Sequence, residues 1–254
     1  MSNSATAPTS TTASSPSSAS DARAPRLAAT NPYRAAAGHE TPAPDGSSAP
    51  AGTAPVEIVA CGALAGHIRE IAARRGWPVI VRPLPAALHN RPEQIKGHAE
   101  RELATAQASN SRALIAYADC GSYGALDELS TKAGLPRLPG LHCYDLYAGE
   151  ARIAQLFAEE PGTYLLTDYL IRSFDRSVIK PLGLDRHPEL WADYFSHYKR
   201  LIWLVQRATP ELEEAAIRIA GQFSLPLTRI DTGTTGLEAA LAPLIETPER
   251  PEKP

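Results

Sequence analysis

The feature that most restricts the fold of this chain is an alternation of short apolar runs with segments of helical spacing. Most of the runs are continuously apolar, as is typical of strands buried on both faces. The six strand candidates are VEIVAC (56–61), PVIVRPL (78–84), ALIAYAD (113–119), TYLLTD (163–168), RLIWLVQ (200–206) and LPLTRID (225–231). A seventh, PRLPGLHC (136–143), is weaker because its two prolines limit strand pairing.

The segments between these runs have the spacing of amphipathic helices. Two sets of apolar residues each share a helical face: Leu64, Ile68, Ile71 and Ala72, and Ile95, Ala99, Leu103 and Ala106. The segment 209–223 begins with Thr209 as an N-cap and Pro210 in the first turn. Strand–helix alternation predicts an α/β fold, with a mainly parallel open sheet of about six to seven strands and helices on both faces.

Composition divides the chain into one domain and two tails. Residues 1–54 are rich in Ser, Thr, Ala and Pro, and they hold too few large apolar residues to offset the entropy lost on ordering. We therefore expect a disordered tail there, a single α/β domain over residues 55–246, and a short polar tail over residues 247–254.

Charge and hydropathy exclude several classes of partner. The net charge of −3 offers no electrostatic basis for binding nucleic acid, and no apolar run has the length of a membrane helix. The first residues lack the basic and apolar regions of a secretory signal, so we expect a cytoplasmic protein. In that compartment thiols stay reduced, and an odd count of three cysteines also argues against a disulfide framework.

All three cysteines lie at strand ends or in loops. Cys61 ends a strand candidate, Cys120 follows another, and Cys143 ends the weak seventh one. Ligand chemistry in an open α/β sheet gathers at the carboxyl ends of the strands, so the three thiols are expected to converge. Three thiolates suit a zinc ion, with a fourth position open, or a [4Fe–4S] cluster. The alternative for each is a small buried side chain, and no short zinc motif such as CxxC is present.

Acidic and imidazole groups at the same ends are the candidates for catalysis. Asp119 precedes Cys120, His142 precedes Cys143, and Asp168 ends the strand TYLLTD. Each has a structural alternative, which is a helix cap for the aspartates and a hydrogen-bonded core position for the histidine. In the nearby LHNRPE segment, Asn90 is expected to cap a helix that begins at Pro92.

A glycine after Cys61 and two glycine-containing turns are candidates for binding a cofactor or an anion. Gly62 would let the backbone after Cys61 approach a ligand, and Gly121 with Ser122 forms a small turn before a helix. Asp231 and Thr232 begin a similar turn, DTGTTG, before the last helix. Neither turn is a P-loop or a GxGxxG fingerprint, so neither identifies a nucleotide.

Several of these segments together resemble a known family. In chain order they are ACGAL, LHNRPE, YADCGSYGALD, RLPGLHCYDLYAG, EPGTYLLTDYLIRSFD, GLDRHPEL, YKRLIWL and DTGTTGLE. Over about residues 56–245 the chain resembles the bacterial and archaeal domain of unknown function family 1638. The resemblance implies an association with corrinoid-dependent methyltransferases that use methylated amines, and hence a corrinoid as a further candidate cofactor. All three cysteines lie in segments that carry the resemblance.

Three functions fit the sequence. The first is a metal or iron–sulfur protein that supports corrinoid-dependent methyl transfer or one-carbon metabolism, using Cys61, Cys120 and Cys143. The second is a metal-free enzyme with Cys120 as nucleophile and His142 or Asp119 as base. The third is a non-catalytic accessory protein that binds a corrinoid, a corrinoid protein or an anionic metabolite. Its partners would be a small molecule or the corrinoid methyltransferase system.

Overall fold

The computed structural model describes residues 55–108 and 111–246, and both predicted tails lie outside these ranges. The described residues form an α/β fold with two parallel sheets of three strands each. The strands of the first sheet are β1 (Val56–Cys61), β2 (Val79–Leu84) and β3 (Ala113–Ala116). Those of the second are β4 (Thr163–Thr167), β5 (Arg200–Val205) and β6 (Leu227–Asp231). All six strand candidates are confirmed, with small changes at their ends.

Helices connect the strands in the order expected for βα units. The first half contains α1 (Gly62–Arg75), η2 (Ala86–Asn90), η3 (Pro92–Gln94), α2 (Ile95–Ala108) and α3 (Ala125–Ala133). The second contains α4 (Asp145–Ala148), α5 (Glu150–Glu159), α6 (Asp168–Phe174), the π-helical turn η4 (Asp175–Ile179), η5 (Pro188–Leu190), α7 (Trp191–Phe195), α8 (Pro210–Phe223) and α9 (Thr235–Glu246). At the start of α8 the Thr209 hydroxyl accepts a hydrogen bond from the Leu212 N–H at 3.3 Å, which confirms the predicted N-cap.

The strand pairing differs from the single sheet of six to seven strands expected from the sequence. Within the described residues the orders are β2–β1–β3 and β4–β5–β6, with no pairing between the two sheets. The weak seventh candidate makes one isolated parallel bridge, Ile115 to Arg137, rather than a strand. Pro136 and Pro139 lack the N–H groups that a continuous ladder requires, which is the physical reason.

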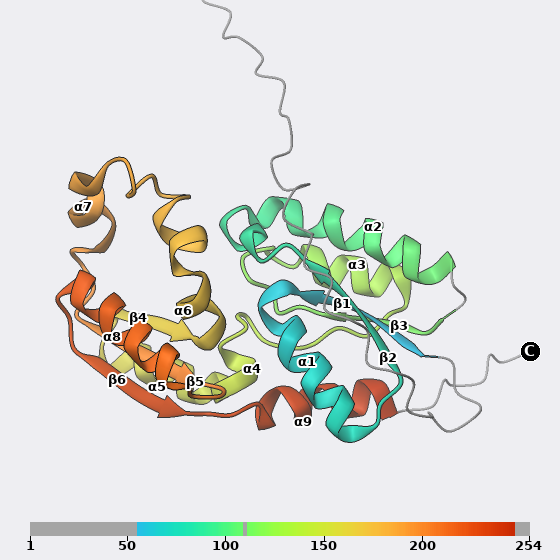
Figure 1. Cartoon of the computed structure of the whole chain (residues 1–254). Helices are drawn as coiled ribbons and strands as arrows, with labels where there is room; N and C mark the ends of the chain where they lie inside the picture. Colours follow the sequence, from blue (N-terminus) through green and yellow to red (C-terminus); the bar gives the residue numbers. More distant parts are fainter. Residues whose placement is uncertain (1–54, 109–110, 247–254) are drawn as a thin grey trace, which may run out of the picture. The chain divides into compact units, whose positions relative to one another are not determined.

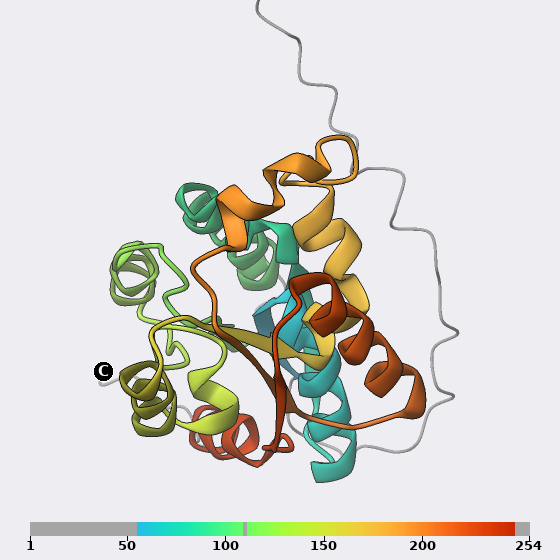
Figure 2. The ribbon, with the colours of Figure 1, turned by 90° about the vertical axis from the view of Figure 1, so that its left-hand side faces the viewer.

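Helices cover both faces of each sheet. Figure 1 shows α2 and α3 on one side of the first sheet and α1 and α9 on the other. In the second sheet, Leu166 and Trp203 pack with α6 and α8, whereas Leu165 and Ile202 pack with α5. Figure 2 shows the strands of this sheet between α5 and α8. Burial on both faces explains the continuous apolar runs in the sequence.

Gly62 is required by close packing where β1 enters α1. A Cβ at this position would lie 2.5 Å from the Leu84 carbonyl oxygen and 3.1 Å from the Ala86 nitrogen. The backbone that approaches Gly62 is therefore that of the β2 end, and ligand binding at Gly62 stays a prediction. Gly66, one turn later in the same helix, has no atom within 4 Å of such a Cβ.

These two glycines give a matched pair of substitutions. We expect Gly62→Ala to lower the free energy of unfolding by about 1–3 kcal/mol, because the backbone at Leu84 cannot move aside freely. Gly66→Ala should instead raise it by about 0.5–1 kcal/mol, because alanine restricts the unfolded chain and favours the helix. Urea unfolding of both variants measures the difference. Equal effects would contradict the packing described at Gly62.

Candidate functional site

The candidate site lies at the carboxyl ends of the strands in the first sheet. In the order β2–β1–β3, the chain winds from β1 to β2 on one side and then crosses to β3 on the other. The crevice outside such a reversal, between the first and third strands, is the usual ligand site of open α/β sheets. Cys61 ends β1 and Cys120 follows β3, so two of the three cysteines lie at the carboxyl ends of these strands.

Cys61 is held at the junction of β1 and α1. It is buried, and it pairs with Leu84 in the β1–β2 register while serving as the N-cap residue of α1. Burial raises the pKa of its thiol to about 11, although the Ala63 and Leu64 N–H groups at the helix start oppose this shift. The expected preference of a helix N-terminus for a thiolate is therefore present but is outweighed by desolvation.

Cys120 lies in a turn of unusual backbone conformation. Its φ of 47° is in the left-handed region, and Tyr123, Gly121 and Gly124 in the same turn also have positive φ. A left-handed conformation costs a non-glycine residue about 1–2 kcal/mol, so surrounding contacts must hold it.

The carboxylate of Asp119 provides these contacts. It accepts hydrogen bonds from the Ser122 hydroxyl at 2.8 Å, the Gly124 N–H at 2.9 Å and the Tyr123 N–H at 3.1 Å. Although burial opposes ionisation, these hydrogen bonds prevail and lower the pKa of Asp119. Both carboxylate oxygens thus stabilise the turn, and this is the capping alternative to a role as general base. The Ser122 hydroxyl is engaged in the same way.

Cys143 is brought to the site by the segment that precedes it. The Leu138 N–H donates to the Ile115 carbonyl at 2.9 Å, and the Cys120 N–H donates to the Leu141 carbonyl at 2.7 Å. Residues 138–141 therefore run along the end of β3, and Cys143 follows at the turn into α4. Two of the three cysteines follow regular strands, and the convergence of all three thiols on one point stays a prediction.

The ionisation of Cys120 is linked to that of two neighbouring groups. The Cys143 thiol favours the Cys120 thiolate most, and the His89 imidazole and the Cys143 N–H favour it as well. Together they outweigh burial and lower the pKa of Cys120. The interaction with Cys120 in turn raises the pKa of Cys143 and that of His89. The Cys120 thiolate therefore favours the protonated form of His89, and His89 favours the thiolate in return.

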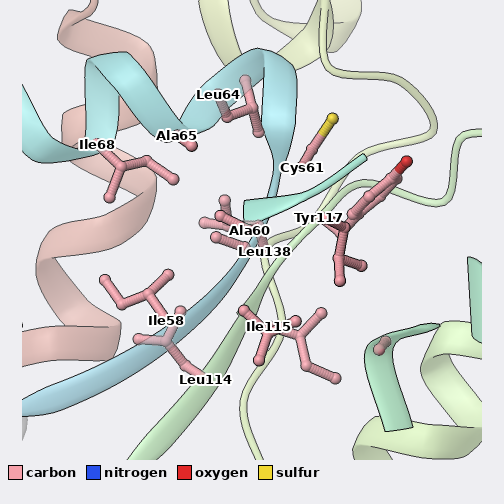
Figure 3. Packing of buried hydrophobic residues seen from close by; sticks show 14 of the residues in the cluster. Ile58, Ala60, Cys61, Leu64, Ala65, Ile68, Leu114, Ile115, Tyr117 and Leu138 are labelled. Carbon is pink, nitrogen blue, oxygen red and sulfur yellow. The ribbon is translucent and has the colours of Figure 1, made fainter. Parts of the chain in front are cut away.

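Cys61 is coupled to this pair by charge. An ionised Cys120 raises the pKa of Cys61 by charge repulsion. Ionised Cys61 and Cys120 both raise the pKa of Cys143 in the same way. Figure 3 shows the Cys61 sulfur and the Tyr117 hydroxyl pointing to the same side beyond the ends of their strands. Tyr117 is 1% exposed, and its hydroxyl has no hydrogen-bond partner of normal geometry among the described residues. Burial raises the pKa of Tyr117, and the negative charge of an ionised Cys61 raises it further.

A second buried polar pair, His67 and Tyr147, interacts electrostatically with the thiols. The His67 Nδ1 and the Tyr147 hydroxyl are 2.8 Å apart, and the rings meet edge to face. Burial raises the pKa of Tyr147, and the Cys143 and Cys61 thiols add to this effect. Burial also lowers the pKa of His67, against the attraction of Glu70 and Asp168. The thiols therefore act by charge on Tyr147, which forms a polar contact between α4 and α1.

The cysteine, histidine and aspartate side chains described above interact in pairs rather than as one group. In the ranges that the structure describes, no three His, Cys, Asp or Glu side chains are grouped in the geometry of a metal site. None of the helices in these ranges has the length and apolar character needed to cross a bilayer.

Asp168 has extensive structural hydrogen bonding. Its side chain, 0% exposed, accepts hydrogen bonds from the Trp203 indole at 2.9 Å, the Gln206 N–H at 3.2 Å and the Arg207 N–H at 2.6 Å. It joins the starts of the loops after β4 and β5, and its link to the thiol site is through the charge that it exerts on His67 and Tyr147.

The other predicted residues point elsewhere. The His142 ring is stacked against Tyr144, with centroids 6.3 Å apart, and the backbone N–H of His142 donates to the Asp145 carboxylate at 2.9 Å. Asp231 is paired with Arg229 at 2.7 Å at the end of β6, and the Thr232 hydroxyl donates to the Val205 carbonyl at 3.1 Å. Gly121 packs close to Pro92. Binding roles for these residues stay predictions.

His89 is the residue that sequence reasoning missed. It lies in η2, directly after β2, and was placed in a segment interpreted as a helix cap. That interpretation of Asn90 is wrong, because its side-chain amide donates to the Ser177 carbonyl at 3.2 Å and the N-cap of η3 is Arg91. The rule that selected the cysteines also applies to His89, because η2 leaves the carboxyl end of β2.

Comparison with known proteins supports one assignment. The chain matches the family described as "Protein of unknown function (DUF1638)" over residues 83–241, which is more than half of its length. The matched region contains His89, Cys120 and Cys143 but begins after Cys61, so it is shorter than the resemblance expected from the sequence. No curated protein and no solved structure matches the chain. The chain belongs to the DUF1638 family of proteins of unknown function.

Proposed function

We propose that this protein binds a zinc ion or a [4Fe–4S] cluster through Cys61, Cys120 and Cys143, and that it supports corrinoid-dependent methyl transfer or related one-carbon chemistry in the cytoplasm. The observation that supports the proposal is the electrostatic interaction of Cys61, Cys120 and Cys143, of which Cys61 ends β1 and Cys120 follows β3. The corrinoid part rests on the family resemblance alone. A corrinoid or a small methylated molecule would then be the partner at the site.

The chemistry of the donors fits a soft cation. If they came together around an ion, the three thiols and the His89 imidazole would form a Cys₃His set, which is a common ligand set for zinc, and three thiolates would also suit a cluster. Each thiolate disfavours the next in the absence of a cation, and a bound cation would remove this repulsion. The Tyr117 hydroxyl would supply a further polar group beside Cys61.

The residues of the chain have separate tasks in this proposal. When bound, the metal or cluster would polarise a substrate thiol or methyl acceptor, or pass an electron. Asp119 holds the turn that presents Cys120, and the Ala63 and Leu64 N–H groups at the start of α1 favour the Cys61 thiolate. His89 keeps Cys120 ionised and therefore ready to bind a cation.

Metal analysis tests the proposal directly. Protein purified without oxygen, as isolated and after reconstitution with zinc or with iron and sulfide, should contain a stoichiometric metal or show the absorption of a cluster. Cys61→Ser, Cys120→Ser and Cys143→Ser should each weaken binding by about 10-fold or more, because each removes a charged donor. Ser122→Ala should retain the metal. A colourless protein that takes up neither zinc nor a cluster would exclude this function.

A second function is favoured by one observation, the Cys120–His89 pair. A thiolate stabilised by an imidazolium is the arrangement of cysteine nucleophiles, so Cys120 would attack an electrophilic carbon of a small substrate with His89 as the acid–base partner. His89 replaces His142 and Asp119 in this role. Rapid alkylation of one thiol in metal-free protein would support it, and equal slow labelling of all three would oppose it.

A further inference from the structure

The buried apolar side chains of the described chain are divided between two lobes. One cluster draws its buried residues from 56–147 and 237–245, so it includes the inner face of α9. Two further clusters draw theirs from residues 153–223 and pack around the second sheet. We therefore define a first lobe, residues 56–148 together with α9, and a second lobe, residues 150–231. Within the described residues, no strand pairing joins the two lobes.

The chain crosses between the lobes twice, and each crossing contains a glycine with positive φ. Gly149 joins α4 to α5 with φ 81° and ψ 144°, and Gly233 lies between β6 and α9 with φ 59°. A Cβ at either position would meet no atom within 4 Å outside the adjoining residues, so packing does not clamp these two points. Domain hinges are a few connecting residues of this kind, which absorb changes in φ and ψ.

The two crossings lie side by side. A Cβ on Gly236, in the first turn of α9, would lie 2.6 Å from the Leu146 carbonyl oxygen and 3.3 Å from that of Tyr147, so α9 begins directly against α4. A cavity of about 150 Å³ is bordered by both crossing segments, through Glu150 of α5 and Gly236 and Ala240 of α9. Two adjacent crossings define a single axis, and a rotation about it leaves the packing inside each lobe intact.

Two contacts that span the lobes away from this axis are polar and exposed. The Asn90 side-chain amide donates to the Ser177 carbonyl at 3.2 Å, and Glu70 pairs with Arg207 at 3.6 Å, with both side chains more than half exposed. Exposed contacts of this kind contribute less than about 1 kcal/mol each, so they can break and form again readily. Asn90 follows the carboxyl end of β2, and its separation from Ser177 would open that edge of the first sheet.

We infer that the two lobes rotate as rigid bodies about Gly149 and Gly233, and that this rotation opens and closes the crevice at the carboxyl ends of the first sheet. Cys61 and Cys120 are 6% and 5% exposed, so a ligand larger than a bare ion needs such an opening to reach them. The rotation itself does not depend on what the crevice binds. The link to a ligand at the thiols rests on the proposed function.

Distances between pairs of spin labels on the full-length protein test the inference. The labels are attached to genetically encoded ketone side chains, which leaves the native cysteines in place. One pair, at Glu100 of α2 and Glu214 of α8, spans the lobes. The pairs Ala73 with Glu100 and Ala154 with Glu214 each lie within one lobe, and all four positions are exposed.

The spanning pair should give a distribution of distances at least about twice as wide as either pair within a lobe, because hinge motions sample several arrangements. A spanning distribution as narrow as the other two would overturn the inference. The protein is treated with a chelator before labelling. Failure of the metal proposal therefore does not affect this result, and a rigid protein would not count against metal binding.

A pair of glycine variants tests the position of the hinge. Gly149→Ala should shift the mean distance of the spanning pair and leave both distances within the lobes unchanged, because alanine disfavours the positive φ of the crossing. Gly134→Ala is the matched control. Gly134 also has a positive φ, 65°, and no atom within 4 Å of a Cβ, but it ends α3 inside the first lobe. A spanning shift of equal size in Gly134→Ala, or none in Gly149→Ala, would show that the hinge is not at Gly149.

Discussion

Replacing Asp168 with alanine should lower the free energy of unfolding by about 3–5 kcal/mol, the largest effect that we expect from one polar substitution in this protein. The carboxylate is fully buried and accepts three hydrogen bonds, from the Trp203 indole and the N–H groups of Gln206 and Arg207. Alanine would leave these donors buried without a partner. Urea unfolding followed by tryptophan fluorescence measures the loss.

Two further variants keep this prediction testable if the alanine variant does not fold. Asp168→Asn retains one acceptor oxygen but places an amide N–H₂ near a backbone donor, so a loss of about 1–3 kcal/mol is expected. Asp175→Ala is the matched control, because its ion pair with Lys180 at 2.8 Å is exposed and should contribute less than about 1 kcal/mol. Wild-type stability in Asp168→Asn and Asp168→Ala would contradict the structural role and return Asp168 to the catalytic candidates.

Replacing His89 with alanine should move the ionisation of Cys120 to higher pH by about 1–3 units. In the wild-type protein the Cys143 thiol and the His89 imidazole both lower the pKa of Cys120. Alkylation of Cys120 should therefore proceed at a nearly constant rate around neutral pH. Without His89 the thiolate fraction below the new pKa should fall by at least about 10-fold, because each pKa unit is a factor of ten.

The measurement is the rate of alkylation by iodoacetamide as a function of pH, with Cys120 followed by mass spectrometry of its tryptic peptide. His142→Ala is the matched control, since the His142 ring stacks against Tyr144 and is not among the groups that shift Cys120. An unchanged profile in His89→Ala, or a shift in His142→Ala of the same size, would show that the wrong histidine has been paired with Cys120.

The role of an aspartate after a strand cannot be predicted from the sequence, because the same residue type serves in catalysis and in capping. Asp119 and Asp168 both follow strands, and the sequence could not separate an acid–base role from a cap. The structure shows that each carboxylate accepts several hydrogen bonds, and those donors come from residues both near and far in the chain. Donors such as the Trp203 indole become neighbours of Asp168 through the pairing of β4 with β5, which no local pattern encodes.

The sequence by itself determined the positions of the six strands and the place of Cys61 and Cys120 after two of them, because apolar runs and turn residues are local properties of the chain. It also determined the start of α8, since a capping threonine and a following proline act within one turn. Tertiary structure decided the rest. The division of the strands into two sheets depends on hydrogen bonds between distant segments, and Pro136 and Pro139 kept residues 136–143 from becoming a strand. The choice of His89 as the partner of Cys120 depends on β2 and β3 flanking β1, which places the ends of all three strands at one edge.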